Sequence, residues 1–209
     1  MTIAAAAVPA LPPLLDLGGT AVFALSGALV AARLKQTFVT VAFFALLTGV
    51  GGGSLRDVLI GVPAFWLRDP WVAPVVLGAA LLAWFTPRRW WEGQALEWAD
   101  AAGLAAFSVL GTAKALALGV APLPAIILGT ITGCAGGIIR DVIAGMPSIL
   151  MRPELYVTAA ALAAALCGLG TWLGLPQGPV WLVAALAGLA LRVAALVWRI
   201  ELPPYSREA

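Results

Sequence analysis

The sequence predicts an all-α membrane protein with seven transmembrane helices, and three observations support this prediction. The chain of 209 residues is 62% hydrophobic and only 11% charged, with a mean hydropathy of +1.01. A soluble domain carries about 25% charged residues, so most of this surface must face something other than water. Several apolar runs approach the roughly 20 residues that cross a hydrocarbon core. These runs occupy most of the chain, which predicts a single transmembrane domain over residues 1–209.

Seven apolar runs follow one another, and prolines, which break helices, lie between them. Most of the tryptophans lie near the ends of the runs. An indole favours that position because its ring is apolar while its N–H stays hydrated at the headgroup level. We expect spans at about 14–34, 37–62, 71–86, 98–119, 122–146, 155–174 and 180–200.

The loop cations predict the orientation of the chain in the membrane. If the N-terminus lies outside, the outer loops hold only Arg68 and the inner loops and tail hold most other loop cations. Cationic loops are retained on the cytoplasmic side, so an outside N-terminus and a cytoplasmic C-terminus are expected. The inner set is Arg33, Lys35, Arg88, Arg89, Arg152, Arg199 and Arg207.

An internal duplication organises the chain. The segment TGVGGGSLRDVLIGVP (48–63) aligns without a gap with TGCAGGIIRDVIAGMP (132–147), an offset of 84 residues. Each copy contains three spans, an odd number, so the second copy must enter the membrane from the opposite side. We therefore expect an inverted repeat of three plus three helices, at about 14–86 and 98–174, followed by a seventh helix at about 180–200.

Glycines cluster in the middle of the second and fifth spans. Each mid-helix glycine costs about 1 kcal/mol relative to alanine, so such a cluster favours a kink or an unwound stretch. Unwound backbone at membrane depth is tolerated where it lines water, and its free carbonyls can then face a cation. Both spans are therefore predicted to be kinked and to line an ion pathway. The alternative is that these glycines only let helices pack closely. They are Gly49, Gly51, Gly52, Gly53, Gly133, Gly136 and Gly137.

Charged pairs follow both glycine clusters, namely Arg56 with Asp57 and Arg140 with Asp141. An ionisable group at the bilayer centre costs about 2.5 kcal/mol or more, so these groups need partners. Adjacent residues point about 100° apart on a helix. We therefore expect pairing between repeats, with Arg56 near Asp141 and Arg140 near Asp57, and a helix dipole that stabilises both carboxylates. The pairs either line a pathway or act as purely structural bridges.

Other charges lie within the apolar runs or at their starts. Lys114 is expected along a water path or as the partner of a buried acid. Arg192 is expected to snorkel toward the membrane surface. Asp16 and Asp100 open equivalent spans, and we interpret both as helix N-caps.

Several function classes are disfavoured by what the sequence lacks. Histidine is absent, which removes the commonest general base and metal ligand. Cys134 and Cys167 lie inside apolar runs and have no CxxC spacing. We therefore expect no enzymatic activity, no bound metal and no cofactor. Without a long basic run, we expect the lipid bilayer and not a nucleic acid as the partner.

Two gap-free copies of a three-span unit, each with Gly-Gly-x-x-Arg-Asp-Val and then Gly-x-Pro, plus a seventh span, resemble the prokaryotic trimeric intracellular cation (TRIC) channels. The resemblance covers about residues 16–199. It implies a homotrimer in which each subunit has its own pore, formed mainly by the second and fifth spans. The pore would conduct K⁺ and, less selectively, Na⁺. The motif carries onto Gly51–Gly53, Arg56 and Asp57, and onto Gly136, Gly137, Arg140 and Asp141.

A monovalent cation channel is the leading functional prediction. The symmetric aromatics Phe23 and Phe107 can plug its pathway or simply pack in the core. The alternative is a secondary transporter for a small zwitterion such as glycine. Inverted repeats suit a carrier equally well, because an arginine can meet the carboxylate and an aspartate the amine.

Overall fold

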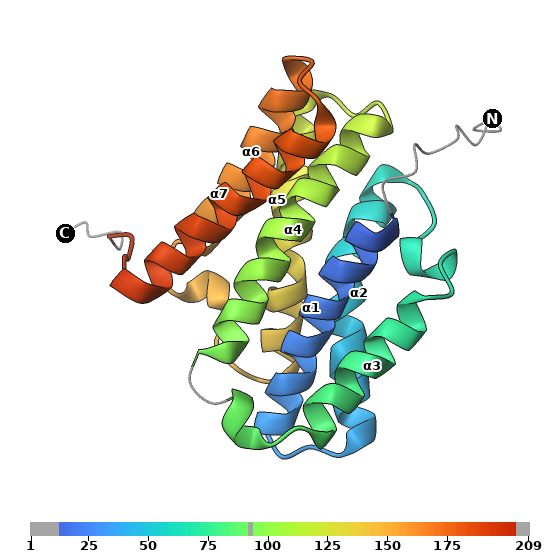
Figure 1. The fold of residues 1–209 in the computed structure, drawn as a ribbon, viewed down its shortest axis with the longest axis vertical. Helices are drawn as coiled ribbons and strands as arrows, with labels where there is room; N and C mark the ends of the chain where they lie inside the picture. The colour runs from blue at the N-terminus through green and yellow to red at the C-terminus, as the bar shows by residue number, and fades with distance from the viewer. Residues whose placement is uncertain (1–12, 92–93, 204–209) are drawn as a thin grey trace, which may run out of the picture.

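The computed structural model describes residues 13–91 and 94–203, so Arg207 of the predicted inner set lies outside the described residues. Within these ranges the chain forms seven α-helices joined by short connections (Figure 1). Each predicted span holds one helix, which confirms the all-α prediction. The helices are α1 (Pro13–Arg33), α2 (Phe38–Ile60), α3 (Val72–Phe85), α4 (Ala95–Ala117), α5 (Pro122–Ile143), α6 (Tyr156–Trp172) and α7 (Gln177–Trp198).

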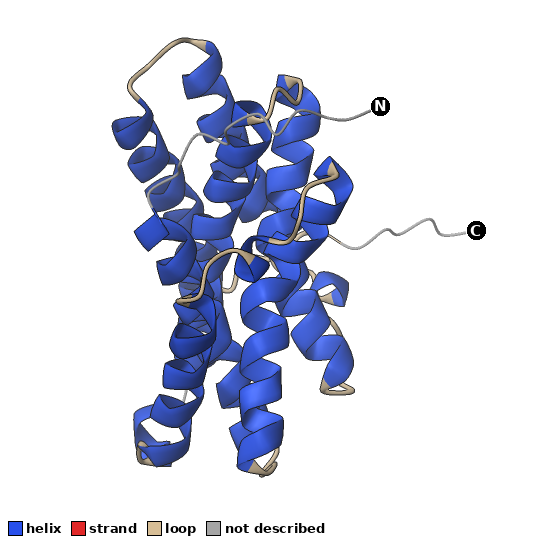
Figure 2. Cartoon of the chain, turned by 90° about the vertical axis from the view of Figure 1, so that its right-hand side faces the viewer, coloured by secondary structure: helices blue, strands red, loops and turns tan. Residues whose placement is uncertain are grey.

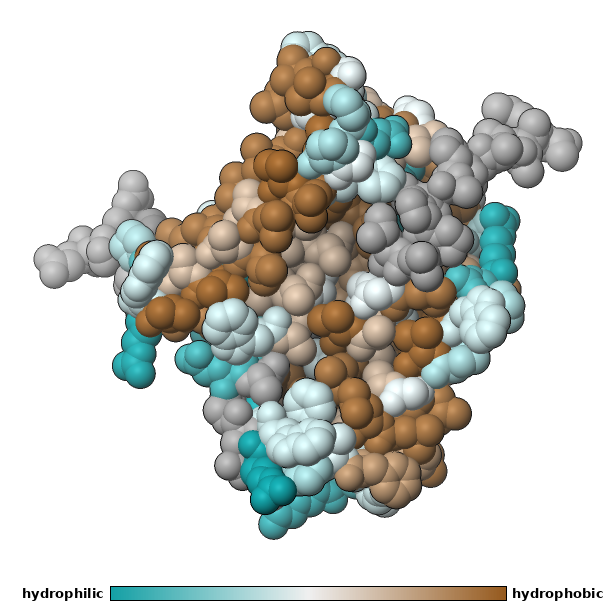
Figure 3. Space-filling model, viewed as in Figure 1, coloured by the Kyte–Doolittle hydropathy of each residue, from teal (hydrophilic) through white to brown (hydrophobic). Residues whose placement is uncertain are grey.

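The helices run roughly lengthwise through the molecule, and most connections lie toward its two ends (Figure 2). By length and composition, α2, α5 and α7 can each cross a membrane, and α3 and α6 are shorter apolar helices. Apolar side chains cover the visible side of α7, whereas hydrophilic ones gather at the lower end and along the margins (Figure 3). This distribution is the one expected of a bundle surrounded by lipid.

The duplicated Gly-x-Pro sequence ends the second helix of each repeat. Gly61 and Gly145 adopt left-handed backbone conformations with φ of 80° and 65°. The N–H of Val62 donates to the carbonyl of Asp57 at 2.9 Å, and that of Met146 donates to the equivalent carbonyl in α5 at 3.0 Å. These are the bonds of a glycine-terminated helix, and the proline that follows prevents its continuation.

Each repeat has its own apolar core, and a small aromatic core joins the two. One cluster of buried side chains comes from α1, α2 and α3, and two further clusters come from the helices α4 to α7. Between the repeats, the rings of Phe23 and Phe107 stack with their centroids 5.4 Å apart and their planes at 16°. The symmetric aromatics therefore meet at the interface of the duplicated units.

The prediction of an unwound stretch in the second and fifth spans is wrong. The α-helix is continuous through both glycine clusters, from Phe38 to Ile60 and from Pro122 to Ile143. The backbone carbonyls there remain within helical hydrogen bonding and are not released as cation ligands. A kink that preserves the helix stays a prediction.

Candidate functional site

The glycine clusters are points of close approach between helices. A Cβ on Gly52 would collide with the carbonyl oxygen of Thr132, and a Cβ on Gly136 would lie 2.9 Å from the carbonyl oxygen of Thr48. These two contacts are symmetric, and each places the backbone of one repeat against that of the other. The small-residue alternative from the sequence therefore accounts for the clusters.

The remaining clustered glycines make room for different neighbours. A Cβ at Gly49 would press on α1 and one at Gly133 on α4, the preceding helix in each repeat. At Gly53 and Gly137 it would press on an aromatic ring, and at Gly51 on an isoleucine side chain of α5. All seven predicted glycines thus lie at packed surfaces, where they bring polar groups of neighbouring helices close together.

We define the first charge cluster as Arg56, Asp57 and Lys114. Arg56 Nε donates to Asp57 Oδ1 at 2.8 Å, and Lys114 Nζ donates to the same oxygen at 2.8 Å. The other carboxylate oxygen, Asp57 Oδ2, accepts the backbone N–H of Phe65 at 2.8 Å. Arg56 and Asp57 are fully buried, so Asp57 has three donors in an environment with little access to water.

We define the second charge cluster as Asp100, Arg140 and Asp141. Arg140 Nε donates to Asp141 Oδ1 at 2.9 Å, and its Nη1 donates to Asp100 Oδ1 at 2.6 Å. Arg140 Nη1 also reaches Ser26 Oγ of the first repeat at 2.5 Å. As in the first cluster, Asp141 Oδ2 accepts a backbone N–H eight residues later, from Ile149 at 2.8 Å.

The expected exchange of partners between Arg56 and Asp141, and between Arg140 and Asp57, is wrong. Each arginine folds back onto the aspartate beside it, because its side chain is long enough to reach a carboxylate that leaves the helix at a different angle. The repeats are instead joined by Lys114 with Asp57 and by Arg140 with Ser26.

The helix dipole does not explain the two aspartates either. Asp57 and Asp141 lie near the C-terminal ends of α2 and α5, where the dipole disfavours a carboxylate. Their negative charge is stabilised by the cations and by the backbone N–H groups that follow each helix. Each aspartate therefore holds the connection after its helix as well as an arginine.

Two further interpretations require correction. Asp100 is not an N-cap, because α4 begins at Ala95 and Asp100 lies in its second turn, paired with Arg140. Arg192 does not snorkel: it is 1% exposed and donates to Glu154 Oε2 at 2.6 Å. Both residues form ion pairs between segments that are far apart in the sequence, and the periodicity of the sequence does not reveal such partners.

The two clusters are not copies of each other. Lys114 corresponds to Val30 in the first repeat, and Ser26 corresponds to Leu110 in the second. The formal charge is +1 on the first cluster and −1 on the second. Among the described residues, both Nη atoms of Arg56 and Asp16 Oδ1 are buried without hydrogen-bond partners. Asp16 and Arg56, which occupy the positions equivalent to Asp100 and Arg140, therefore do not form the corresponding ion pair in the described structure.

The aromatic stack lies midway between the clusters. Phe107 is seven residues from both Asp100 and Lys114 along α4, about 10 Å in each direction, so the clusters are about 20 Å apart. Both phenylalanines are 1% exposed. Helices α1 and α2 also carry the buried hydroxyls of Thr20 and Thr48. Neither hydroxyl oxygen has a hydrogen-bond partner within the described part of the chain.

Sequence reasoning missed several members of this site. Ser26, Thr20 and Thr48 lie within apolar runs, and nothing in a single hydroxyl distinguishes a site residue from a packed one. Thr48 did carry a signal, because Thr-Gly opens both copies of the duplicated motif. Tyr156, buried with its hydroxyl unpartnered in the described chain, lacks a counterpart in the first repeat, where Val72 occupies the equivalent position.

Comparison with known proteins supports the duplication. A family model described as glycine transporter matches the chain twice, at residues 13–88 and 97–172. The two matches begin 84 residues apart, which is the offset found within the sequence.

Three relatives extend the likeness to whole proteins. A membrane protein of Vibrio cholerae named UPF0126 is 38% identical and covers 92% of this chain and 82% of its own. The inner membrane protein YadS of Escherichia coli is 35% identical, and the match covers 92% of this chain and 95% of YadS. The TRIC channel orthologue from Rhodobacter sphaeroides, which has a crystal structure, is 36% identical in sequence. The match covers 90% of this chain and 98% of that one, and the two structures superpose with a TM-score of 0.83. The chain therefore belongs to the trimeric intracellular cation (TRIC) channel family of membrane proteins, which the glycine transporter family model also describes.

Proposed function

We propose that this protein is a monovalent cation channel that passes K⁺ somewhat better than Na⁺. Its pathway runs within each subunit of a homotrimer, across a prokaryotic plasma membrane, with the N-terminus outside. The observation that carries the proposal is the pair of buried charge clusters on opposite sides of the Phe23–Phe107 stack, at the interface of the repeats. Solved relatives described as TRIC cation channels support the same activity.

The charges explain how cations are favoured over anions. The second cluster has a formal charge of −1, with Asp100 Oδ2 buried and without a partner among the described residues. In the first cluster Arg56 and Lys114 share the single carboxylate of Asp57, which leaves a formal charge of +1 there, whereas Arg140 of the second cluster is held between two carboxylates. At the second cluster a permeating cation therefore meets carboxylate and hydroxyl oxygens, and this cluster is the one that favours cations over anions.

Weak selectivity follows from the same geometry. Discrimination between K⁺ and Na⁺ in selective filters uses rings of backbone carbonyls that replace the hydration shell. Here the helices are continuous, so the available ligands are scattered hydroxyls and carboxylates. We expect modest selectivity.

The stacked phenylalanines form the gate in this proposal. Two buried aromatic rings exclude water, and a hydrophobic constriction of this kind closes a pore by dewetting. Replacing both Phe23 and Phe107 by alanine should increase the open probability in planar-bilayer recordings. Phe43→Ala is the matched control, because the Phe43 side chain of α2 lies on the protein surface and is 54% exposed.

The recordings also distinguish channel from carrier. Purified wild-type protein in K⁺ solutions should show discrete openings, larger in K⁺ than in Na⁺, with anions largely excluded. Liposomes that take up glycine in a saturable, counterflow-stimulated manner, without discrete K⁺ currents, would replace the channel with the zwitterion transporter. Unchanged gating in the Phe23→Ala, Phe107→Ala double variant would remove the gate assignment alone.

A further inference from the structure

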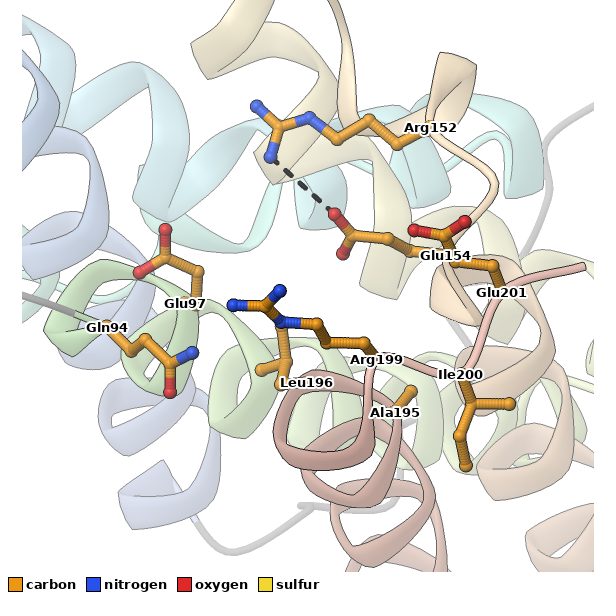
Figure 4. A pocket seen from close by; sticks show the side chains of 9 residues that line it. All are labelled: Gln94, Glu97, Arg152, Glu154, Ala195, Leu196, Arg199, Ile200 and Glu201. Atoms are coloured by element: carbon orange, nitrogen blue, oxygen red, sulfur yellow. Dashed lines mark ion pairs between the residues drawn. The ribbon is translucent and has the colours of Figure 1, made fainter.

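A polar hollow beside the C-terminal end of α7 is separate from the charge clusters of the proposed pathway. Its volume is about 210 Å³, and its wall comes from the start of α4, the connection before α6 and the end of α7. Figure 4 shows Glu97 on one side, Arg152, Glu154 and Glu201 on the other, and Arg199 between them. The hollow therefore contains charges of both signs.

The chain after α7 is folded to build this wall. Arg199 has a left-handed backbone conformation with φ of 51°, which turns the chain back after the helix. Glu201 then forms an antiparallel bridge with Glu154, and the N–H of Leu202 donates to the carbonyl of Pro153 at 2.7 Å. The seventh helix, which lies outside the duplication, is thereby attached to the second repeat.

Part of the charge in the hollow is already neutralised, and part is not. Glu154 pairs with the buried Arg192 at 2.6 Å and with Arg152 at a looser 3.7 Å. In the portion of the chain that the structure describes, Glu97 Oε2 is buried without a partner, and no ion pair is formed by the side chains of Arg199 or Glu201. Two carboxylates and the guanidinium of Arg199 are thus available to a ligand with both an anionic and a cationic group, and the loosely paired Arg152 can add a second guanidinium.

The position of the hollow matches the headgroup level of a membrane. Trp98 and Trp198 flank it in sequence, next to Glu97 and Arg199, and both indoles are exposed. Exposed tryptophans favour the membrane–water interface. A second, mainly apolar hollow of about 270 Å³ adjoins the first along α6, and Arg152 and Glu154 form part of both walls.

We propose that this site binds a phospholipid whose headgroup carries a phosphate and a primary ammonium, as phosphatidylethanolamine does. Arg199 and Arg152 bind the phosphate, Glu97 and Glu201 accept hydrogen bonds from the ammonium, and an acyl chain follows the apolar hollow on α6. A purely anionic headgroup would face the two free carboxylates. A choline headgroup has no N–H to donate to them.

Native mass spectrometry of the purified trimer, after incubation with equal amounts of phosphatidylethanolamine, phosphatidylglycerol and phosphatidylcholine, tests the proposal. Wild-type protein should retain the ethanolamine lipid about tenfold more than either other lipid, since each charged hydrogen bond contributes about one such factor. The double variant Glu97→Gln, Glu201→Gln should lose this preference, and Arg152→Gln, Arg199→Gln should lose the retained lipid.

Arg68→Gln is the matched control, because Arg68 occupies the position equivalent to Arg152, is exposed and lies outside the hollow. It should retain the lipid as wild type does. Equal retention of the three lipids by wild-type protein would overturn the proposal without any variant. An unchanged lipid preference in both double variants would also overturn it. So would lipid that is retained only by dissociated subunits, because the hollow would then be covered by a neighbouring subunit in the trimer. None of these outcomes depends on ion conduction.

Discussion

Lys114 Nζ of α4 donates to Asp57 Oδ1 of α2 at 2.8 Å, and this contact joins the two repeats where their sequences differ. The equivalent of Lys114 in the first repeat is Val30, so the contact has no symmetric counterpart. The inverted repeat supplies two similar scaffolds, and differences at single equivalent positions, such as Lys114 and Val30, make their charge clusters unequal. An ion on the proposed pathway between the repeats would therefore meet a different electric field at each cluster.

Replacing Lys114 by methionine should destabilise the protein by about 2 kcal/mol, because Asp57 loses one charged hydrogen bond in a buried environment. The midpoint of detergent-induced unfolding measures the loss. In an Asp57→Asn background the same substitution should cost much less, since the two residues act as a pair. Additive losses in the double-variant cycle would show that the contact contributes no coupling.

Asp141 combines two roles that substitutions can separate. Asp141→Asn keeps an oxygen that can accept the N–H of Ile149 but loses the charge that pairs with Arg140, whereas Asp141→Ala loses both. Both should reduce K⁺ conductance, and the alanine variant should also be the less stable by about 1 kcal/mol. Asp69→Asn, in the connection before α3, is the control for conductance. If the Asp141 variants fold normally and conduct like wild type, the role of Asp141 is structural only.

Much of the fold could be predicted from the sequence because membrane spans have strong, local signals. The seven runs, the 84-residue duplication and the Gly-x-Pro stops all correspond to structural features. Helix ends were predicted to within a few residues, since Gly61 and Gly145 end α2 and α5 through local backbone geometry. These features depend on neighbours in the chain and need no knowledge of packing.

The partners within the site could not be predicted in the same way. Glycine at 52 or 136 is compatible with either a broken helix or a close helix crossing, and only the position of the neighbouring helix decides between them. The partner of Arg140 could not be chosen from helical angles alone, because a flexible side chain reaches carboxylates in several directions. Three-dimensional proximity was the missing information.

The orientation of the chain can be tested through its last helix. α7 begins at Gln177 and ends at Trp198, so a reporter in the loop before it and one fused after the C-terminus should lie on opposite sides. The loop cations predict a cytoplasmic C-terminal reporter, visible as active green fluorescent protein and inactive alkaline phosphatase. Reporters on the same side would contradict the seven-span topology, and the reversed pair would contradict the orientation only.

Substitution of single glycines distinguishes close packing from helix breaking. Gly52→Ala places a methyl group against the carbonyl oxygen of Thr132 in α5. Because this is a backbone atom and not the end of a flexible side chain, the variant should lose about 1–3 kcal/mol of stability. Gly78→Ala in α3 is the matched control, because nothing lies within 4 Å of its added Cβ. It should be neutral or gain up to about 1 kcal/mol from the higher helix propensity of alanine. Thermal unfolding of both variants in the same detergent gives the comparison. If Gly52 served only to weaken its helix, alanine would stabilise at both positions, and equal gains in melting temperature would refute the packing role.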